Sequence, residues 1–116
     1  MEIRRIGVIG AGQMGTGIAQ VFAQADFDVL LNDVNPGAMQ AALERIEKGY
    51  GRLIKRGKLE EAAAASAMQR IATTTAVEEI AQTDVVIEAA TENEAVKLKI
   101  FEALRPHLAA HTILTS

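Results

Sequence analysis

The chain has 116 residues and contains no cysteine, no tryptophan and only two prolines. Without cysteine, disulfide bonds and thiolate chemistry are excluded. Aromatic residues are few, so isoleucine, valine, leucine and alanine must build the core. The longest apolar runs are far shorter than the ~20 residues that span a bilayer, and the opening "MEIRRIGVIG" lacks the pattern of a signal peptide. These absences predict a cytoplasmic protein that does not enter a membrane.

The formal net charge is −3, so the chain lacks the positive field that gathers nucleic acid or anionic lipid. We therefore expect neither nucleic acid nor a membrane as a partner. His107 and His111 are four residues apart, which is a spacing that can bind a metal on a helix. Pro106 interrupts that helix, and no third ligand with suitable spacing follows. The sequence therefore predicts no metal site.

Apolar runs alternate with longer helical patterns along the whole chain. This alternation predicts an α/β fold with a parallel sheet covered by helices, within a single domain spanning residues 1–116. The chain ends on the last strand, from which we expect an excised or truncated domain. Strands are expected at residues 6–10, 27–33, 70–75, 84–90 and 112–116, and helices at residues 14–24, 76–82 and 92–108.

The segment between the second and third strands predicts a helical hairpin that projects from the sheet. Asn35 and Pro36 suit the N-cap and first position of a long helix, and Gly57 suits its C-terminal turn. The alanine-rich "LEEAAAASAMQ" then predicts the second helix. Gly49 and Gly51 lie inside the long helix, where each glycine costs about 1 kcal/mol against alanine. A close neighbour or a ligand would explain them.

A glycine-rich turn, "GAGQMG", directly follows the first strand and opens a helix. In this context Gly10 allows a tight turn, Gly12 lets the backbone approach a pyrophosphate, and Gly15 lets the helix pack closely on the sheet. The free N–H groups and the positive dipole end of the helix favour phosphate groups. The pattern predicts a dinucleotide site.

Asp33 provides a second, independent indication. It closes "VLLND" at the end of the second strand, 23 residues after Gly10. A carboxylate there accepts hydrogen bonds from the adenosine ribose and repels a 2′-phosphate, which favours NAD over NADP. The alternative is an ordinary turn followed by a solvated acid. Motif, context and acid together favour the NAD site.

Three charged residues, Glu88, Glu92 and Lys97, lie around the carboxyl end of the fourth strand. Ligands of open α/β sheets bind at this edge, near the point where the strand order reverses. Glu92 could therefore bond a ribose, and Lys97 could bind an anion. Residue type alone favours a plainer interpretation, in which Glu92 stabilises a helix N-terminus and Lys97 is solvated.

A second charged group lies at the tip of the predicted hairpin, where Lys55, Arg56 and Lys58 follow one another closely. Such a run is usually a solvated helix end, since cations are favoured there, and residue type alone favours that interpretation. The alternative is a site for a phosphate-bearing substrate tail. We interpret three methionines as packing residues: Met14, Met39 and Met68.

Three stretches, "IGVIGAGQMGTGIAQVFAQADFDVLLND", "VVIEAATENEAVKLKIF" and "TILTS", together resemble the N-terminal NAD-binding domain of 3-hydroxyacyl-CoA dehydrogenases. The resemblance covers essentially the whole chain. It implies a Rossmann-type doubly wound parallel sheet with a helical-hairpin insert after the second strand. In the family an all-helical dimerisation domain follows, so the full-length protein would be a homodimer. The implied reaction is the reversible oxidation of an (S)-3-hydroxyacyl-CoA to the 3-ketoacyl-CoA with NAD.

The resemblance also assigns roles to individual residues. For Glu92 and Lys97 it favours ligand binding over the plainer interpretation of a helix-stabilising acid and a solvated lysine. Arg56 matches a basic position that binds CoA, and Gly49 matches a position that is a CoA-contacting serine in some members. The positions implied to bind NAD are Gly10, Gly12, Gln13, Met14, Gly15, Asp33, Ala90, Glu92 and Lys97.

The family motif continues "SNTS" after the fifth strand, and Ser116 matches its first serine. The catalytic serine, the general-base histidine, its glutamate partner and a substrate-binding asparagine would therefore follow residue 116. We expect no catalytic residue within the chain and no dehydrogenase turnover by the chain alone. Two alternatives stay open: a related carnitine or gulonate dehydrogenase, and a non-catalytic NAD-binding module.

Overall fold

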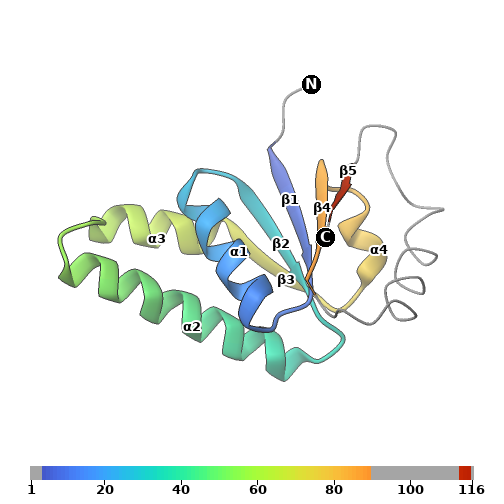
Figure 1. Cartoon of the computed structure of the whole chain (residues 1–116), viewed down its shortest axis with the longest axis horizontal. Helices are drawn as coiled ribbons and strands as arrows, with labels where there is room; N and C mark the ends of the chain where they lie inside the picture. The colour runs from blue at the N-terminus through green and yellow to red at the C-terminus, as the bar shows by residue number, and fades with distance from the viewer. Residues whose placement is uncertain (1–3, 90–112, 116) are drawn as a thin grey trace.

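The computed structural model describes residues 4–89 and 113–115. Within these residues, strands alternate with helices along the chain (Figure 1). The elements are β1 (Arg5–Ile9), α1 (Gln13–Gln24), β2 (Asp28–Asn32), α2 (Pro36–Lys55), α3 (Glu61–Gln69), β3 (Ile71–Thr74), α4 (Val77–Ile80), β4 (Val85–Glu88) and β5 (Ile113–Thr115).

The strands form one parallel sheet in the order β3-β2-β1-β4-β5. The central strand is β1, whose Ile6 lies opposite Val29 of β2 and Val85 of β4. Along the chain, β2 and β3 are added on one side of β1, and β4 and β5 are then added on its other side. The strand order therefore reverses at β1. This is the doubly wound arrangement that the sequence predicts.

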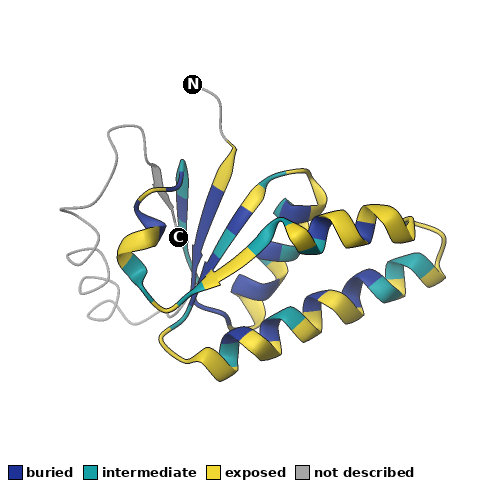
Figure 2. Cartoon of the chain, turned by 180° about the vertical axis from the view of Figure 1, so that it is seen from behind, coloured by how far each residue is buried: buried dark blue, intermediate teal, exposed yellow. Residues whose placement is uncertain are grey.

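Helices cover both faces of the sheet, and alternate residues of β1 point to opposite faces. Ile6 and Val8 are buried in a cluster with α1, α2 and α3. Ile9 is buried in a second cluster with Ile80 at the end of α4 and Val86 of β4. Figure 2 shows the buried residues concentrated in the strands and on the helix sides that face them.

The predicted hairpin is confirmed as α2 and α3, which extend beyond the edge of the sheet (Figure 1). The side chain of Asn35 caps α2, since its Oδ1 accepts a hydrogen bond from Gly37 N at 2.8 Å. Met39 and Ile46 of α2 are buried towards the body of the protein. The outer faces of both helices are exposed (Figure 2).

Strand boundaries differ from the expected ones by one or two residues. The strand β1 ends at Ile9 because Gly10 adopts φ 101° and leaves the extended conformation. The strand β4 ends at Glu88, two residues earlier than expected. The predicted helix at residues 92–108 lies outside the described residues.

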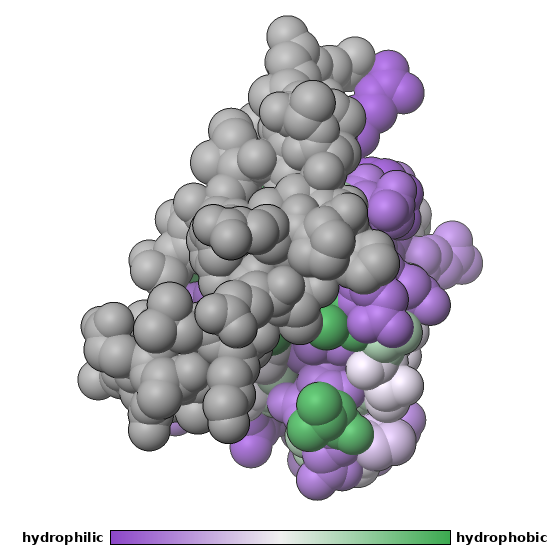
Figure 3. All heavy atoms as spheres, turned by 90° about the vertical axis from the view of Figure 1, so that its right-hand side faces the viewer, coloured by the Kyte–Doolittle hydropathy of each residue, from purple (hydrophilic) through white to green (hydrophobic). Residues whose placement is uncertain are grey.

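Large hydrophobic side chains are exposed singly in the described part of the chain: Met14, Val21 and Val34. From the side of α4, the visible described surface is mainly hydrophilic, with scattered hydrophobic residues (Figure 3). Among the described helices, none is both long and apolar enough to cross a membrane.

A close contact between β1 and the segment after α4 gives a testable prediction about packing. A Cβ at Gly7 would lie 2.6 Å from Thr83 Oγ1 and 2.8 Å from Ile80 Cγ2. Both residues are fully buried, and Thr83 Oγ1 donates to Ile80 O at 2.6 Å. We expect Gly7→Ala to lower the free energy of unfolding by about 1–3 kcal/mol, as overpacking does. Urea denaturation measures the change.

The matched control is Gly51→Ala in α2, because a Cβ there meets nothing within 4 Å. Alanine is the better helix former, so this variant is expected to gain up to about 1 kcal/mol. An equal effect of the two substitutions would contradict the packing described for Gly7.

Candidate functional site

The glycine turn leaves the central strand at the point where the strand order reverses. Gly10 N donates to Asn32 O of β2 at 2.7 Å. The φ of 101° at Gly10 lies in a region that side chains disfavour. The next residue, Ala11, is 3% exposed, and its N–H donates to Asp33 Oδ2 at 3.0 Å. The turn is therefore attached to the end of β2 at two successive residues.

Gly15 has no room for a side chain, because a Cβ there would collide with the carbonyl oxygen of Gly10. The same Cβ would lie 3.5 Å from Val8 Cγ1, so α1 packs closely on both the turn and β1. The predicted role of Gly15 in close packing is thus confirmed, with the turn itself as the main contact. Glycine at this position lets the helix start directly against the turn.

Gly12 has the opposite environment. It is exposed, and a Cβ there would meet nothing within 4 Å. Gly12 is the N-cap of α1 and makes no side-chain cap, so the first N–H groups of the helix lack an acceptor from it. The first helical bond runs from Thr16 N to Gly12 O at 2.9 Å. Open space thus faces backbone donors at a helix N-terminus, which suits phosphate groups.

The carboxylate of Asp33 lies at this turn. Its Oδ2 accepts from Ala11 N, and its Oδ1 accepts from Asn35 N at 2.9 Å. Each oxygen of an ionised carboxylate has more than one acceptor position, so both oxygens can still accept from a ligand. Asp33 is half-buried. It is fixed in place by backbone donors, unlike a solvated loop acid.

Asn32 is a residue of this site that the sequence analysis missed. Its side chain is 3% exposed, and Nδ2 donates to Thr74 O at the end of β3 at 3.0 Å. Its backbone carbonyl accepts from Gly10, so Asn32 joins the ends of three strands. The sequence signal for this role was a polar residue that directly follows the apolar run "VLL" of β2 and precedes Asp33.

The remaining predicted cofactor residues divide into two groups. Gln13 and Met14 are exposed in the first turn of α1, with Met14 63% exposed. The interpretation of Met14 as a packing residue is therefore wrong, because its helix face lies beside the open space and not against the sheet. Met39, which is 7% exposed, does pack in the core. The other predicted residues, Ala90, Glu92 and Lys97, lie outside the described residues.

Arg56 does not join the glycine turn. It follows the last residue of α2, a helix of 20 residues that extends over about 30 Å from its start near Asp33. Arg45 and Arg52 are eleven and four residues earlier, which places them on the same side of the helix. All three are exposed, and none has an ion pair with another described residue. The helical spacing of these arginines was in the sequence, but only Arg56 was predicted to bind.

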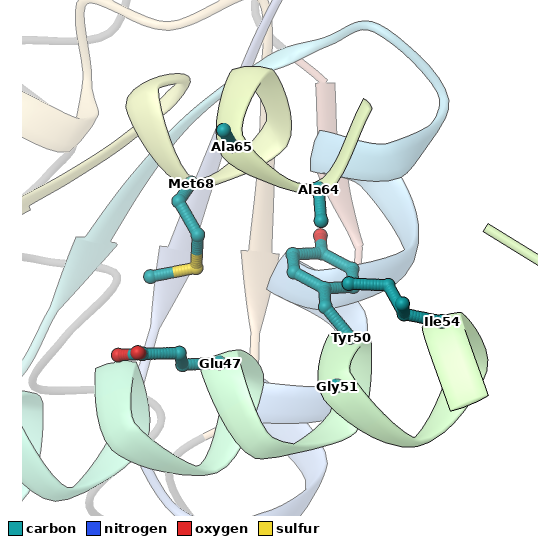
Figure 4. Close-up of a pocket in the computed structure, with 7 residues that line it drawn as sticks. All are labelled: Glu47, Tyr50, Gly51, Ile54, Ala64, Ala65 and Met68. Carbon is teal, nitrogen blue, oxygen red and sulfur yellow. The ribbon is translucent and has the colours of Figure 1, made fainter. Parts of the chain in front are cut away.

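A separate groove lies between the hairpin helices (Figure 4). Its volume is about 550 Å³, and its lining is mainly apolar. Burial raises the pKa of the Tyr50 hydroxyl, which nearby Arg70 only partly opposes. The described residues contain no group of three side chains that could hold a metal. The lining residues are Glu47, Tyr50, Gly51, Ile54, Ala64, Ala65 and Met68, which offer no paired acid and base.

The parallel sheet, its reversal point, the glycine turn and the fixed carboxylate together define a Rossmann-type dinucleotide-binding domain. The chain belongs to the family described as "3-hydroxyacyl-CoA dehydrogenase, NAD binding domain", whose model matches residues 5–116. This confirms the resemblance drawn from the sequence and identifies NAD as the cofactor of the domain.

The chain is similar to curated proteins named as 3-hydroxybutyryl-CoA dehydrogenases. It is 46% identical over its whole length to a probable enzyme of Bacillus subtilis and covers 40% of that protein. It is 41% identical to the enzyme of Bradyrhizobium diazoefficiens, where 98% of this chain covers 39% of the relative. The chain therefore spans about 40% of the length of these relatives.

Solved structures of 3-hydroxybutyryl-CoA dehydrogenases are also similar to this chain. The crystal structure of (S)-3-hydroxybutyryl-CoA dehydrogenase from Ralstonia eutropha matches with a TM-score of 0.93 and 39% identity. That match covers 98% of this chain and 41% of the other chain. The 3-hydroxybutyryl-CoA dehydrogenase of Escherichia coli matches with a TM-score of 0.94 and 34% identity, over 99% of this chain and 25% of the other.

The two glycines with opposite environments give a prediction for the site. Gly12→Ala keeps the fold but fills the open space at the helix N-terminus. We expect its free energy of unfolding to change by no more than about 1 kcal/mol, while its affinity for NADH falls at least roughly tenfold, by about 1.4 kcal/mol or more. Calorimetric titration and urea denaturation measure the two effects.

Gly15→Ala is the contrasting variant, because its Cβ collides with backbone in the turn. We expect this variant to lose both stability and NADH affinity. If Gly12→Ala bound NADH as the wild type does, the open space beside Gly12 would not be the pyrophosphate site.

Proposed function

We propose that this chain holds NAD for an enzyme that interconverts (S)-3-hydroxyacyl-CoA and 3-ketoacyl-CoA. The observation that carries the proposal is the attachment of the glycine turn to Asp33 through Ala11 N–H at 3.0 Å. It brings a phosphate-binding helix N-terminus and a ribose-binding carboxylate into one site. Support for the substrate class comes from relatives named as 3-hydroxybutyryl-CoA dehydrogenases.

In this proposal different residues bind different parts of NAD. Gly10, Gly12 and Gly15, with Gln13 and Met14, bind the pyrophosphate at the start of α1, and Asp33 binds the adenosine ribose. The resemblance places Glu92 and Lys97 near the nicotinamide and its ribose, and it also assigns Ala90 to the cofactor site. When bound, NAD supplies the hydride acceptor. The chain's own contribution is to bind and orient it.

The proposed preference for NAD over NADP rests on charge at the end of β2. Asp33 is held there by Ala11 and Asn35. The next residue, Val34, is 86% exposed and offers no positive charge for a 2′-phosphate. A phosphate beside a fixed carboxylate is repelled. The site therefore favours an unmodified ribose.

The proposed substrate contact is on the hairpin. Arg56, with Arg52 on the same side of α2, presents guanidinium groups without an ion pair to other described residues. Guanidinium groups bind phosphates through paired hydrogen bonds. The phosphates of CoA are the proposed ligands, which places the substrate tail near the end of α2 and the reactive end near the sheet.

The proposal for the whole protein extends beyond this chain. The resemblance implies that the general base, its carboxylate partner and the catalytic serine follow residue 116. An all-helical domain would complete the active site and form a homodimer, and the enzyme would work in the cytoplasm. Residues 1–116 would then be the cofactor half, with no catalytic residue of their own.

The proposal is tested by joining this chain to the residues that follow the matched segment in the 46% identical Bacillus subtilis relative. We expect this chimera to oxidise NADH in the presence of acetoacetyl-CoA. The chain alone is expected to bind NADH without such turnover, because the resemblance places the general base after residue 116. A folded chimera that binds NADH but leaves acetoacetyl-CoA unreduced would contradict the proposal, as would turnover by the chain alone.

The substrate contact is tested in the same chimera. We expect Arg52→Ala combined with Arg56→Ala to raise the KM for acetoacetyl-CoA at least roughly tenfold, since each charged hydrogen bond contributes about 1.5–3 kcal/mol. The kcat and the KM for NADH are expected to stay within about twofold, since both arginines are far from the glycine turn. Arg45→Ala, one turn before Gly49, is the comparison variant. An unchanged KM in the double variant would contradict a phosphate site there.

A further inference from the structure

Where α1 crosses α2, the backbone and the side chain of Gln20 both lie against α2. The carbonyl oxygen of Gln20 accepts from the Tyr50 hydroxyl at 2.6 Å. Tyr50 is 1% exposed, and burial raises the pKa of its hydroxyl, so the hydroxyl stays protonated and keeps donating. The backbone of Gln20 is therefore fixed against α2.

The side-chain amide of Gln20 lies over Gly49 of α2. A Cβ at Gly49 would be 2.7 Å from Gln20 Nε2 and 2.8 Å from Gln20 Oε1. Real Cβ atoms essentially never approach so closely, so any other residue at position 49 would push the amide away. The amide makes no hydrogen bond to another described residue. Gln20 is half-buried, and its amide carries both a donor and an acceptor.

Gln20 also stands between the two proposed binding regions. Gly49 precedes Arg52 by three residues and Arg56 by seven, so the amide lies on the same side of α2 as these arginines. Towards the glycine turn, Gly17 is exposed, and a Cβ there would meet nothing within 4 Å. Gly17 therefore leaves open space on α1 one turn before Gln20, beyond the exposed side chains of Gln13 and Met14.

An acyl-CoA that reached from the arginines to the edge of the sheet where NAD is proposed to bind would cross this point with its uncharged middle. That part is the pantetheine arm, whose amide groups donate and accept as the Gln20 amide does. We propose that the side chain of Gln20 binds the pantetheine arm, and that Gly49 is a glycine because it leaves room for that side chain. This inference rests on the proposed function, since it takes acyl-CoA as the substrate class.

Nuclear magnetic resonance of the ¹⁵N-labelled chain tests the contact directly. We expect CoA and pantetheine each to shift the side-chain NH₂ signals of Gln20, and 3′,5′-ADP to shift the signals of Arg52 and Arg56 instead. Gln20→Met keeps the size of the side chain and removes its hydrogen-bonding groups. It is expected to weaken CoA binding about three- to tenfold, the effect of one uncharged hydrogen bond.

Gln24→Met is the matched control, since Gln24 is an exposed glutamine at the end of the same helix. It is expected to bind CoA as the wild type does. Gly49→Ala displaces the amide and should weaken CoA binding as Gln20→Met does, with no further loss in the double variant. All these variants should keep the wild-type affinity for NADH.

Two results would overturn the inference. One is CoA binding that leaves the Gln20 signals and the Gln20→Met affinity unchanged. The other is the absence of any Gln20 shift up to roughly millimolar CoA or pantetheine. Failure of the wild-type chain to bind NADH would instead contradict the proposed function. A failure of the Gln20 inference and a failure of the proposed function are thus distinguished by the CoA and NADH titrations.

Discussion

The hydrogen bond from Ala11 N–H to the carboxylate of Asp33 is the contact on which the site depends. A bond to a charged group contributes about 1.5–3 kcal/mol, and it joins residues 22 positions apart in the sequence. Together with the bond from Gly10 N to Asn32 O, it sets the glycine turn against the end of β2. The start of α1 then faces open space at the edge of the sheet.

The architecture follows from how this contact is supported. Gly15 lets α1 begin directly against the turn, and Gly7 lets the segment after α4 approach β1 from the opposite face. Asn32 fixes the end of β3 beside Asp33 through Thr74 O. The two glycines thus allow neighbouring elements to pack closely on β1 and the turn, and the buried side-chain amide of Asn32 aligns the ends of β2 and β3. The hairpin adds a second region, in which α2 carries arginines far from the turn.

Local patterns in the sequence were sufficient to predict the fold. The alternation of apolar runs and helical stripes predicted the parallel sheet, and Asn35, Pro36 and Gly57 predicted where α2 begins and ends. "GAGQMG" and Asp33 lie together as predicted, because each directly follows one of two paired parallel strands, β1 and β2. The family resemblance, now confirmed, supplied the reaction class that residue patterns alone did not.

Tertiary contacts could not be predicted in the same way. The role of Asn32 depends on the neighbouring end of β3, and the position of Gln20 over Gly49 depends on how two helices cross. Met14 was interpreted as a packing residue because a methionine at helical spacing is usually buried; its exposure follows from the open edge at which α1 begins. Each case depends on a neighbour that is distant in sequence.

The most direct test of the account is a calorimetric titration of the chain with NADH and, separately, with NADPH. The account predicts saturable binding of NADH and much weaker binding of NADPH, because the carboxylate of Asp33 accepts from a free ribose and repels a 2′-phosphate. Equal affinity for the two nucleotides, or no binding of either by a chain that circular dichroism shows to be folded, would contradict it.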